Sequence, residues 1–156
     1  MPTVIRFNSD GMRPFAMMLE RFGENLQDAE QAFDKMADHA SVVFRGQFET
    51  QGRRLGNSKW APLSPKYAAQ KARAFPGMPL LVATGDLRKS LAFRPFGIDE
   101  ITSKGMTLGT AVPYASYHQR GTPRMPQRKL VGRLSAQDTR AMSTILHEHI
   151  VKGVRA

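Results

Sequence analysis

Histidine and carboxylate side chains near the C-terminus are the first residues of this 156-residue sequence that could bind a metal. His147 and His149 flank Glu148, whereas a zinc-binding HExxH motif needs its histidines four residues apart on one helical face. A spacing of two residues turns the imidazoles about 200° from one another around a helix. We therefore expect no metal site, with His149 at the edge of the core and His147 in solvent.

A nucleophilic triad is the second arrangement that the sequence could offer. Ser116 lies two residues before His118, and Asp86 or Asp99 could orient the imidazole. A serine nucleophile of this kind lies on a sharp turn between glycines, and no such sequence surrounds Ser116. Phosphate-binding patterns such as GxxxxGK[ST] or GxGxxG are also absent from the sequence. We predict that the protein is not an enzyme and uses no cofactor.

Basic side chains are the most prominent chemical feature of the sequence. Lys and Arg number 23 against 13 Asp and Glu, which gives a net charge of +10. Residues 1–50 hold five basic and eight acidic side chains, whereas residues 51–156 hold 18 basic and five acidic side chains. This imbalance favours a polyanionic partner or an acidic protein surface.

Two segments concentrate the positive charge. Residues 53–73 hold six basic side chains, residues 120–133 hold five, and neither segment contains an acid. Such loops could contact DNA phosphates without reading base sequence. An equally supported interpretation is a set of solvated loops, or ion pairs with acidic neighbours in an assembly.

The composition is that of one globular domain, which we expect to include residues 1–156. Hydrophobic residues make up 41% of the chain, and no run approaches the roughly 20 apolar residues that span a bilayer. The first residues contain no apolar signal-peptide core. Cysteine is absent, which excludes disulfides and thiolate metal sites. We therefore expect synthesis in the cytoplasm and no membrane partner.

Apolar spacing predicts the helices that position these residues. A stripe of residues three and four apart predicts a long helix over 26–50, with acids in its first half. Shorter helices are predicted from Pro14 to about Gly23, over 65–74, over 84–91 and, as a helical turn, over 114–119. A last helix is predicted to start at Ser135, which forms a capping-box-like pair with Asp138.

Three segments have the composition of strands. Residues 3–7 predict a short strand, and residues 91–101 and 105–111 predict a hairpin that turns at 102–105. The predicted fold class is α+β, with a small antiparallel sheet packed by a long N-proximal helix and a C-terminal helix.

A series of short motifs, taken in order, resembles one protein family. The motifs are Trp60-Ala61-Pro62-Leu63-Ser64, Tyr67, Lys71, the segment from Leu81 to Leu91, Leu108-Gly109-Thr110, Tyr114-Ala115, His118-Gln119, Gly121, Pro126-Gln127-Arg128, and the segment from Val131 to Ser135 with Asp138. Their order and spacing resemble the virion morphogenesis family of tailed bacteriophages over about residues 48–152.

The resemblance implies a structural role at the head–tail junction of a virion built in the bacterial cytoplasm. The implied protein is a tail-completion, tail-terminator or neck component that joins the tail to the DNA-filled head. Related proteins form rings, usually homo-hexamers, between head-completion or connector proteins and tail-tube proteins. Duplex DNA in the lumen is a further, non-specific contact. A minor component needed for head maturation and a basic nucleic-acid-binding accessory protein remain as alternatives.

Candidate contact residues follow from this interpretation. We expect Trp60 to anchor its loop, and we expect the acids Asp28, Glu30 and Asp34 to contact the basic face of a neighbouring subunit. The remaining candidates for an interface or for the lumen are basic: Arg120, Arg124, Arg128, Lys129 and Arg133.

Overall fold

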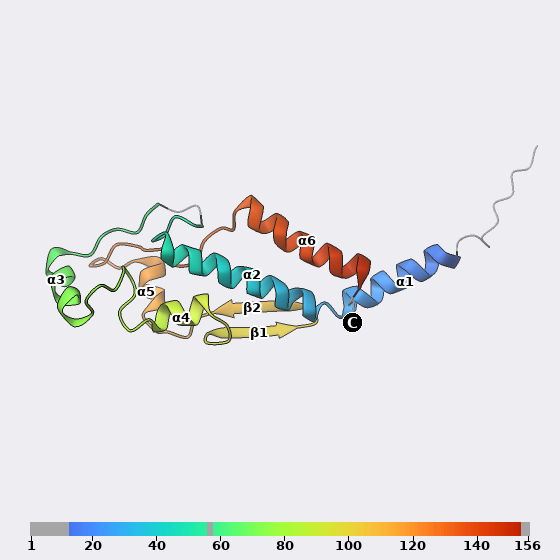
Figure 1. The fold of residues 1–156 in the computed structure, drawn as a ribbon, viewed down its shortest axis with the longest axis horizontal. Helices are drawn as coiled ribbons and strands as arrows, with labels where there is room; N and C mark the ends of the chain where they lie inside the picture. The colour runs from blue at the N-terminus through green and yellow to red at the C-terminus, as the bar shows by residue number, and fades with distance from the viewer. Residues whose placement is uncertain (1–12, 56–57, 154–156) are drawn as a thin grey trace, which may run out of the picture.

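The α+β fold predicted from the sequence is confirmed. A computed structural model of the chain describes residues 13–55 and 58–153, which form six helices and one two-stranded sheet (Figure 1). The predicted strand over 3–7 lies outside the described residues. In chain order the elements are α1 (Arg13–Gln27), α2 (Glu30–Glu49), α3 (Pro65–Ala74), α4 (Asp86–Ala92), β1 (Ile98–Thr102), β2 (Gly105–Gly109), α5 (Ala115–Arg120) and α6 (Ala136–Lys152).

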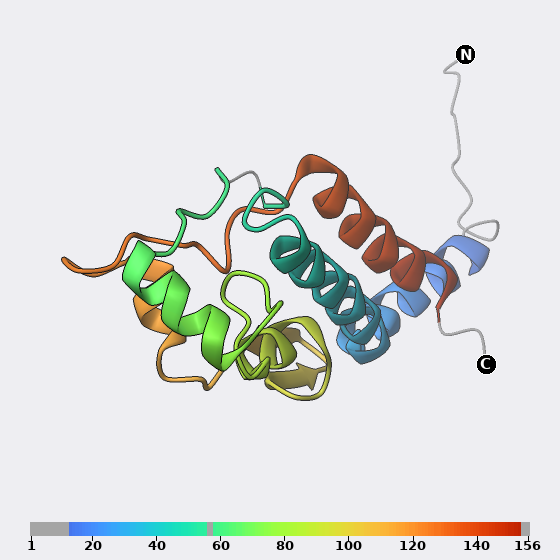
Figure 2. The same cartoon turned by 60° about the vertical axis from the view of Figure 1, so that its left-hand side comes forward.

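The central element of the fold is α2. Figures 1 and 2 show α6 beside it on one side and the β1–β2 hairpin with α4 on the other, and α2 contacts all four. Small residues, including Ala32, Ala37 and Ala40, lie on its buried faces. Because their side chains are short, neighbouring elements can approach the helix closely.

The single helix predicted over 26–50 is instead two helices that meet at Asp28 and Ala29. The backbone N–H of Ala29 donates to the carbonyl oxygen of Ser103 in the hairpin turn (3.2 Å). Nε2 of His149 lies 2.7 Å from the carbonyl oxygen of Asp28. These partners lie far along the chain, so local spacing could not show the break. The predicted helix end at Gly23 was also wrong, because α1 continues to Gln27.

The hairpin is shorter than predicted. β1 and β2 pair antiparallel, with Ile98 opposite Gly109 and Thr102 opposite Gly105. Residues 91–92 belong to α4 rather than to a strand. Between α4 and β1, Nε of Arg94 donates to Asp99 of β1 (2.9 Å) while its Nη atoms reach α2. Arg94 therefore fixes the start of the hairpin against α2.

Asp138 fixes α6 to α2. The predicted cap is confirmed, because the Ser135 hydroxyl oxygen accepts from the backbone N–H of Asp138 (3.1 Å). The Asp138 carboxylate is almost fully buried and accepts from both Nη atoms of Arg54 (2.6 and 2.8 Å) and lies 3.1 Å from His39 Nε2. Hydrogen bonds from Arg54, and then from Ser135 and His39, hold the pKa of Asp138 far below its usual range despite its burial.

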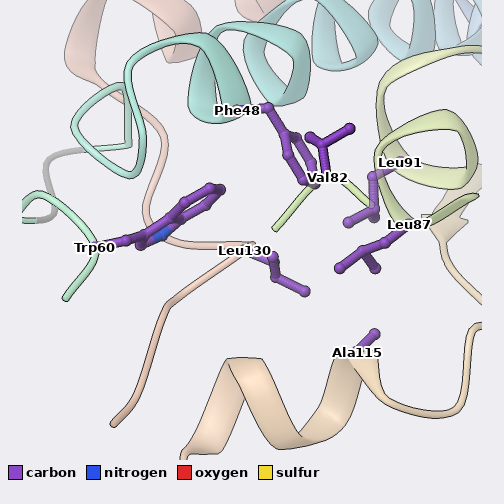
Figure 3. Packing of buried hydrophobic residues seen from close by; sticks show 7 residues of the cluster. All are labelled: Phe48, Trp60, Val82, Leu87, Leu91, Ala115 and Leu130. Carbon is purple, nitrogen blue, oxygen red and sulfur yellow. The ribbon is translucent and has the colours of Figure 1, made fainter. Parts of the chain in front are cut away.

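The hydrophobic core lies where the C-terminal part of α2 meets α4, α5 and the loops around Trp60 and Leu130 (Figure 3). Phe48 and Trp60 pack edge to face with ring centroids 5.5 Å apart. The core cluster is completed by Val82, Leu87, Leu91, Ala115 and Leu130. Across the described ranges, no helix is long and apolar enough to cross a bilayer.

Candidate functional site

A wide groove lies beside this core. Figure 1 shows α3 and α5, which bound it, at the end of the molecule opposite α1. The groove has a volume of about 710 Å³, and it is bounded by α3, the start of α4, α5 and residues 124–128. We call it the α3–α5 groove. Its apolar lining comes mainly from Pro62, Leu63, Leu81, Leu87, Met125 and Pro126.

Three tyrosines stand around the α3–α5 groove with exposed rings. Tyr67, Tyr114 and Tyr117 are 50%, 43% and 57% exposed. A tyrosine offers an apolar ring and a polar tip, a combination enriched at protein interfaces. The groove thus presents apolar and aromatic surface that the described part of this chain leaves uncovered.

Two buried cations form part of the groove wall. Arg128 is 3% exposed and donates from Nε to the carbonyl oxygen of Ala61 and from Nη2 to that of Pro62, both at 2.8 Å. Nζ of Lys71 donates to the carbonyl oxygens of Met78 (2.6 Å) and Pro79 (2.9 Å).

These cations hold the loops that shape the groove, but their charge is not neutralised by ion pairs. Within residues 13–55 and 58–153 the salt bridges involve neither Lys71 nor Arg128. Burial lowers the pKa of the Arg128 guanidinium, because removing the group from water disfavours its charged form. The lining of the groove is therefore mainly apolar, and its charged side chains are Lys71, Arg124 and Arg128 against the single acid Asp86.

His118 lies in the same wall but does not form a catalytic triad. Burial, and then the nearby charge of Arg128, lower the pKa of His118 and favour its neutral form. Its ring packs edge to face with Tyr114 at 6.1 Å, and its buried Nδ1 has no hydrogen-bond partner among the residues that the structure describes. The Ser116 hydroxyl donates to the carbonyl oxygen of Pro113 instead, at 3.2 Å.

The two candidate aspartates of the triad are likewise engaged elsewhere. Asp86 accepts from the hydroxyl of Thr84 (2.6 Å), and Asp99 accepts from Arg94. The two histidines near the C-terminus lie as predicted, because His149 is buried and His147 is exposed.

The residues predicted for an interface or for the lumen fall into two groups. Trp60 is only 4% exposed, and its indole N–H donates to the carbonyl oxygen of Lys129 (2.8 Å). Trp60 and the buried Arg128 are therefore interior residues of the subunit. The other four predicted residues are exposed and form its basic surface: Arg120, Arg124, Lys129 and Arg133.

The predicted acidic contact residues lie together near the start of α2. Asp28, Glu30 and Asp34 are exposed and border a shallow depression. Asp34 also pairs with Arg94 (2.7 Å), so its charge is already compensated within the subunit. The subunit contact expected for Asp28, Glu30 and Asp34 stays a prediction.

One structural residue at this end of the molecule was missed by the sequence analysis. Gln47 is fully buried, donates to the carbonyl oxygen of Lys129 (2.9 Å) and accepts from the N–H of Leu55 (3.1 Å). It ties α2 to two loops that are distant in sequence. The sequence feature that could have predicted its burial is its position four residues after Val43, on the apolar stripe of the helix.

Comparison with known families agrees with the motifs around the groove. The phage virion morphogenesis family matches residues 10–151, so the chain belongs to that family, as the sequence predicted. Its role is structural, in the assembly of a bacteriophage particle. No curated protein and no solved structure matches the chain. Many of the family-like motif residues line the α3–α5 groove, among them Pro62, Leu63, Tyr67, Lys71, Tyr114, His118 and Arg128.

Proposed function

We propose that this protein forms a ring at the head–tail junction, where it completes or terminates the tail, or forms the neck, and joins the tail to the DNA-filled head. The function is that of a structural component without catalysis. The observation that carries the proposal is the family match over residues 10–151. The separation of acidic and basic surfaces along the molecule supports it.

That separation suits contacts between identical subunits. Residues 20–38, on α1 and the first half of α2, hold six acids and two bases. Residues 58–74 and 111–133, around the α3–α5 groove, hold nine basic side chains and no acid. Opposite charges at the two ends favour head-to-tail association, which closes into a ring when the rotation between subunits permits it. We propose that the ring contains six subunits.

The exposed basic side chains also suit a lumen that DNA crosses. Arg120 ends α5, and Arg124, Lys129 and Arg133 lie on the connection that follows; all four are exposed. Contacts of such side chains to phosphates do not depend on base sequence. The protein neighbours proposed are head-completion or connector proteins on one side and tail-tube proteins on the other.

Electron microscopy of a phage with a nonsense mutation in this gene tests the proposal. We expect DNA-filled heads beside unattached tails, or tails of abnormal length, and rescue by the wild-type chain supplied from a plasmid. Normal infectious particles would contradict the proposal. Empty or immature heads would also contradict it and would favour a role in head maturation. Normal particles combined with salt-sensitive DNA binding by the free protein would favour a nucleic-acid-binding accessory protein.

A further inference from the structure

The first helix of the described chain has an apolar face without a partner. Phe15, Met18, Leu19 and Leu26 recur at spacings of three, one and seven residues, which places them on one side of α1. They are 49%, 43%, 50% and 59% exposed, and no residue of α1 is buried. Met17 lies on the opposite side of the helix.

α1 is joined to the rest of the subunit mainly near its C-terminal end. It contacts α6, where Nδ2 of Asn25 donates to the carbonyl oxygen of Ile150 (2.9 Å). The preceding turns extend away from the other elements as an arm (Figure 1). An amphipathic helix gains most of its stability by burying its apolar face, so this arm requires a surface to cover it.

The α3–α5 groove offers such a surface, but not within the same subunit. Figure 1 shows α1 at one end of α2, and α3 and α5, which bound the groove, at the other. A 20-residue helix is about 30 Å long. The arm therefore cannot reach the groove of its own chain without unpacking from α6, whereas it can reach the groove of another copy.

Charge also favours this pairing. Glu20 and Glu24 lie on the polar side of α1, and Asp28 and Glu30 follow at its junction with α2. The groove is lined by the exposed Arg124 and by the buried cations Lys71 and Arg128, against the single acid Asp86. An arm seated with its apolar face in the groove brings acidic residues next to a basic rim.

We propose that α1 of one subunit docks in the α3–α5 groove of the next copy of this chain and so forms the repeating contact of the ring. This inference rests on the proposed function, because it supplies the contact that the ring requires. The contact is heterologous: each subunit gives its arm to one neighbour and receives the arm of the other.

The absence of cysteine from the chain allows a direct test by disulfide trapping. The test variant carries Leu19→Cys on the apolar face of the arm and Tyr117→Cys at the groove. The matched control carries Met17→Cys, on the opposite face of the same helix turn, with the same Tyr117→Cys. Both residues of each pair are exposed in the subunit, so the fold is retained.

Each variant is supplied from a plasmid to the nonsense phage, and the particles are oxidised and run on a non-reducing gel. We expect a ladder of cross-linked multimers from the Leu19→Cys variant and at least about tenfold less from the Met17→Cys control, because only one face of the arm meets the groove. Equal ladders, or no ladder from the test variant in particles that contain it, would overturn the inference. Covalent capture of a different phage protein through Leu19→Cys would also overturn it, since the arm would then have another partner.

Leu19→Glu separates this inference from the proposed function. A charge on the apolar face should reduce rescue of the nonsense phage by about tenfold or more, whereas Met17→Glu should rescue like the wild-type chain. If Leu19→Glu rescues fully while the nonsense phage still lacks joined tails, the arm contact is wrong and the junction function stands. If the nonsense phage makes normal particles, the proposed function itself fails.

Discussion

At the scale of single residues, buried charged groups hold this chain together. Two backbone carbonyl oxygens, rather than a carboxylate, accept the hydrogen bonds of Arg128. These bonds fix the loop before α3. Asp138 is buried with Arg54 and His39 and joins α6 to α2. Each group links segments more than 60 residues apart, so each can be tested through the stability of the whole fold.

Arg128→Lys should destabilise the subunit although it keeps the charge. A lysine cannot donate in the planar, forked geometry that serves the carbonyls of Ala61 and Pro62, and one buried acceptor is left unsatisfied at a cost of about 2 kcal/mol. Urea unfolding followed by circular dichroism measures this. Arg124→Lys, in the same segment but exposed, is the control and should leave the midpoint unchanged. Equal midpoints for both variants would contradict the role of Arg128.

Asp138→Asn should lower the free energy of unfolding by about 3 kcal/mol at pH 7, because the Arg54 guanidinium loses its buried partner. The folded-state pKa of Asp138 lies below its unfolded value. The carboxylate therefore stabilises the fold above about pH 4, and this stabilisation is lost as the pH falls through the folded pKa. The difference between variant and wild type should shrink below about pH 4.

The matched control for that pH series is Glu148→Gln. Glu148 is on the same helix, but its ion pair with Lys152 is exposed on both sides, and such pairs contribute less than about 1 kcal/mol. An Asp138→Asn variant that unfolds at the same urea concentration as Glu148→Gln at pH 7 would refute the structural role assigned to Asp138.

At the scale of elements, features that depend on residues close together in the sequence were predicted correctly. The break between α1 and α2 was missed because it depends on residues far away in the sequence. Ser135 and Asp138 lie three residues apart, so the cap of α6 could be predicted from the sequence. The break at Asp28 and Ala29 depends on Ser103 and His149, which no local pattern reveals. The helix predicted to stop at Gly23 continues to Gln27, because a glycine inside a helix costs only about 1 kcal/mol and does not force the helix to end.

At the candidate site, too, the local motifs could be recognised in the sequence, whereas the contacts between distant segments could not. The motifs around Trp60, Tyr67 and Lys71 indicated the family, but not that they form one groove. The indole of Trp60 bonds a carbonyl 69 residues away, and its burial follows from that contact. Arg128 was predicted as a surface charge because a basic, proline-rich segment is usually solvated. Its burial depends on carbonyls in a loop that precedes it by more than 60 residues.

The turn after α2 offers a test of how tightly the Trp60 loop is packed. Gly52 has φ +103°, and a Cβ there would lie 2.6 Å from Cδ1 of Trp60. Gly52→Ala should cost about 3 kcal/mol or more, from backbone strain together with overpacking. Gly77→Ala is the control, because Gly77 also has positive φ but open space around it, and its cost should be about 1 kcal/mol. Similar thermal midpoints for the two variants would show that the Trp60 loop moves freely.

At the scale of the whole molecule, the separation of charge predicts how subunits meet. Asp28→Lys combined with Glu30→Lys should reduce rescue of the nonsense phage by about tenfold or more, because every contact in a closed ring carries the change. Glu49→Lys, exposed at the other end of α2, is the control and should rescue normally. Plaque counts provide the measurement, and equal rescue by both variants would contradict an acidic subunit contact.

The central claim is that this chain forms a ring at the head–tail junction, and cryo-electron microscopy of wild-type particles tests it most directly. A map of the junction, averaged about the tail axis, should contain a ring into which α2, α6 and the β1–β2 hairpin fit as one repeating unit. Mass spectrometry of the same particles should detect the chain in a few copies per particle. Particles that lack the chain, or that carry it only within the capsid shell or along the tail tube, would contradict the claim.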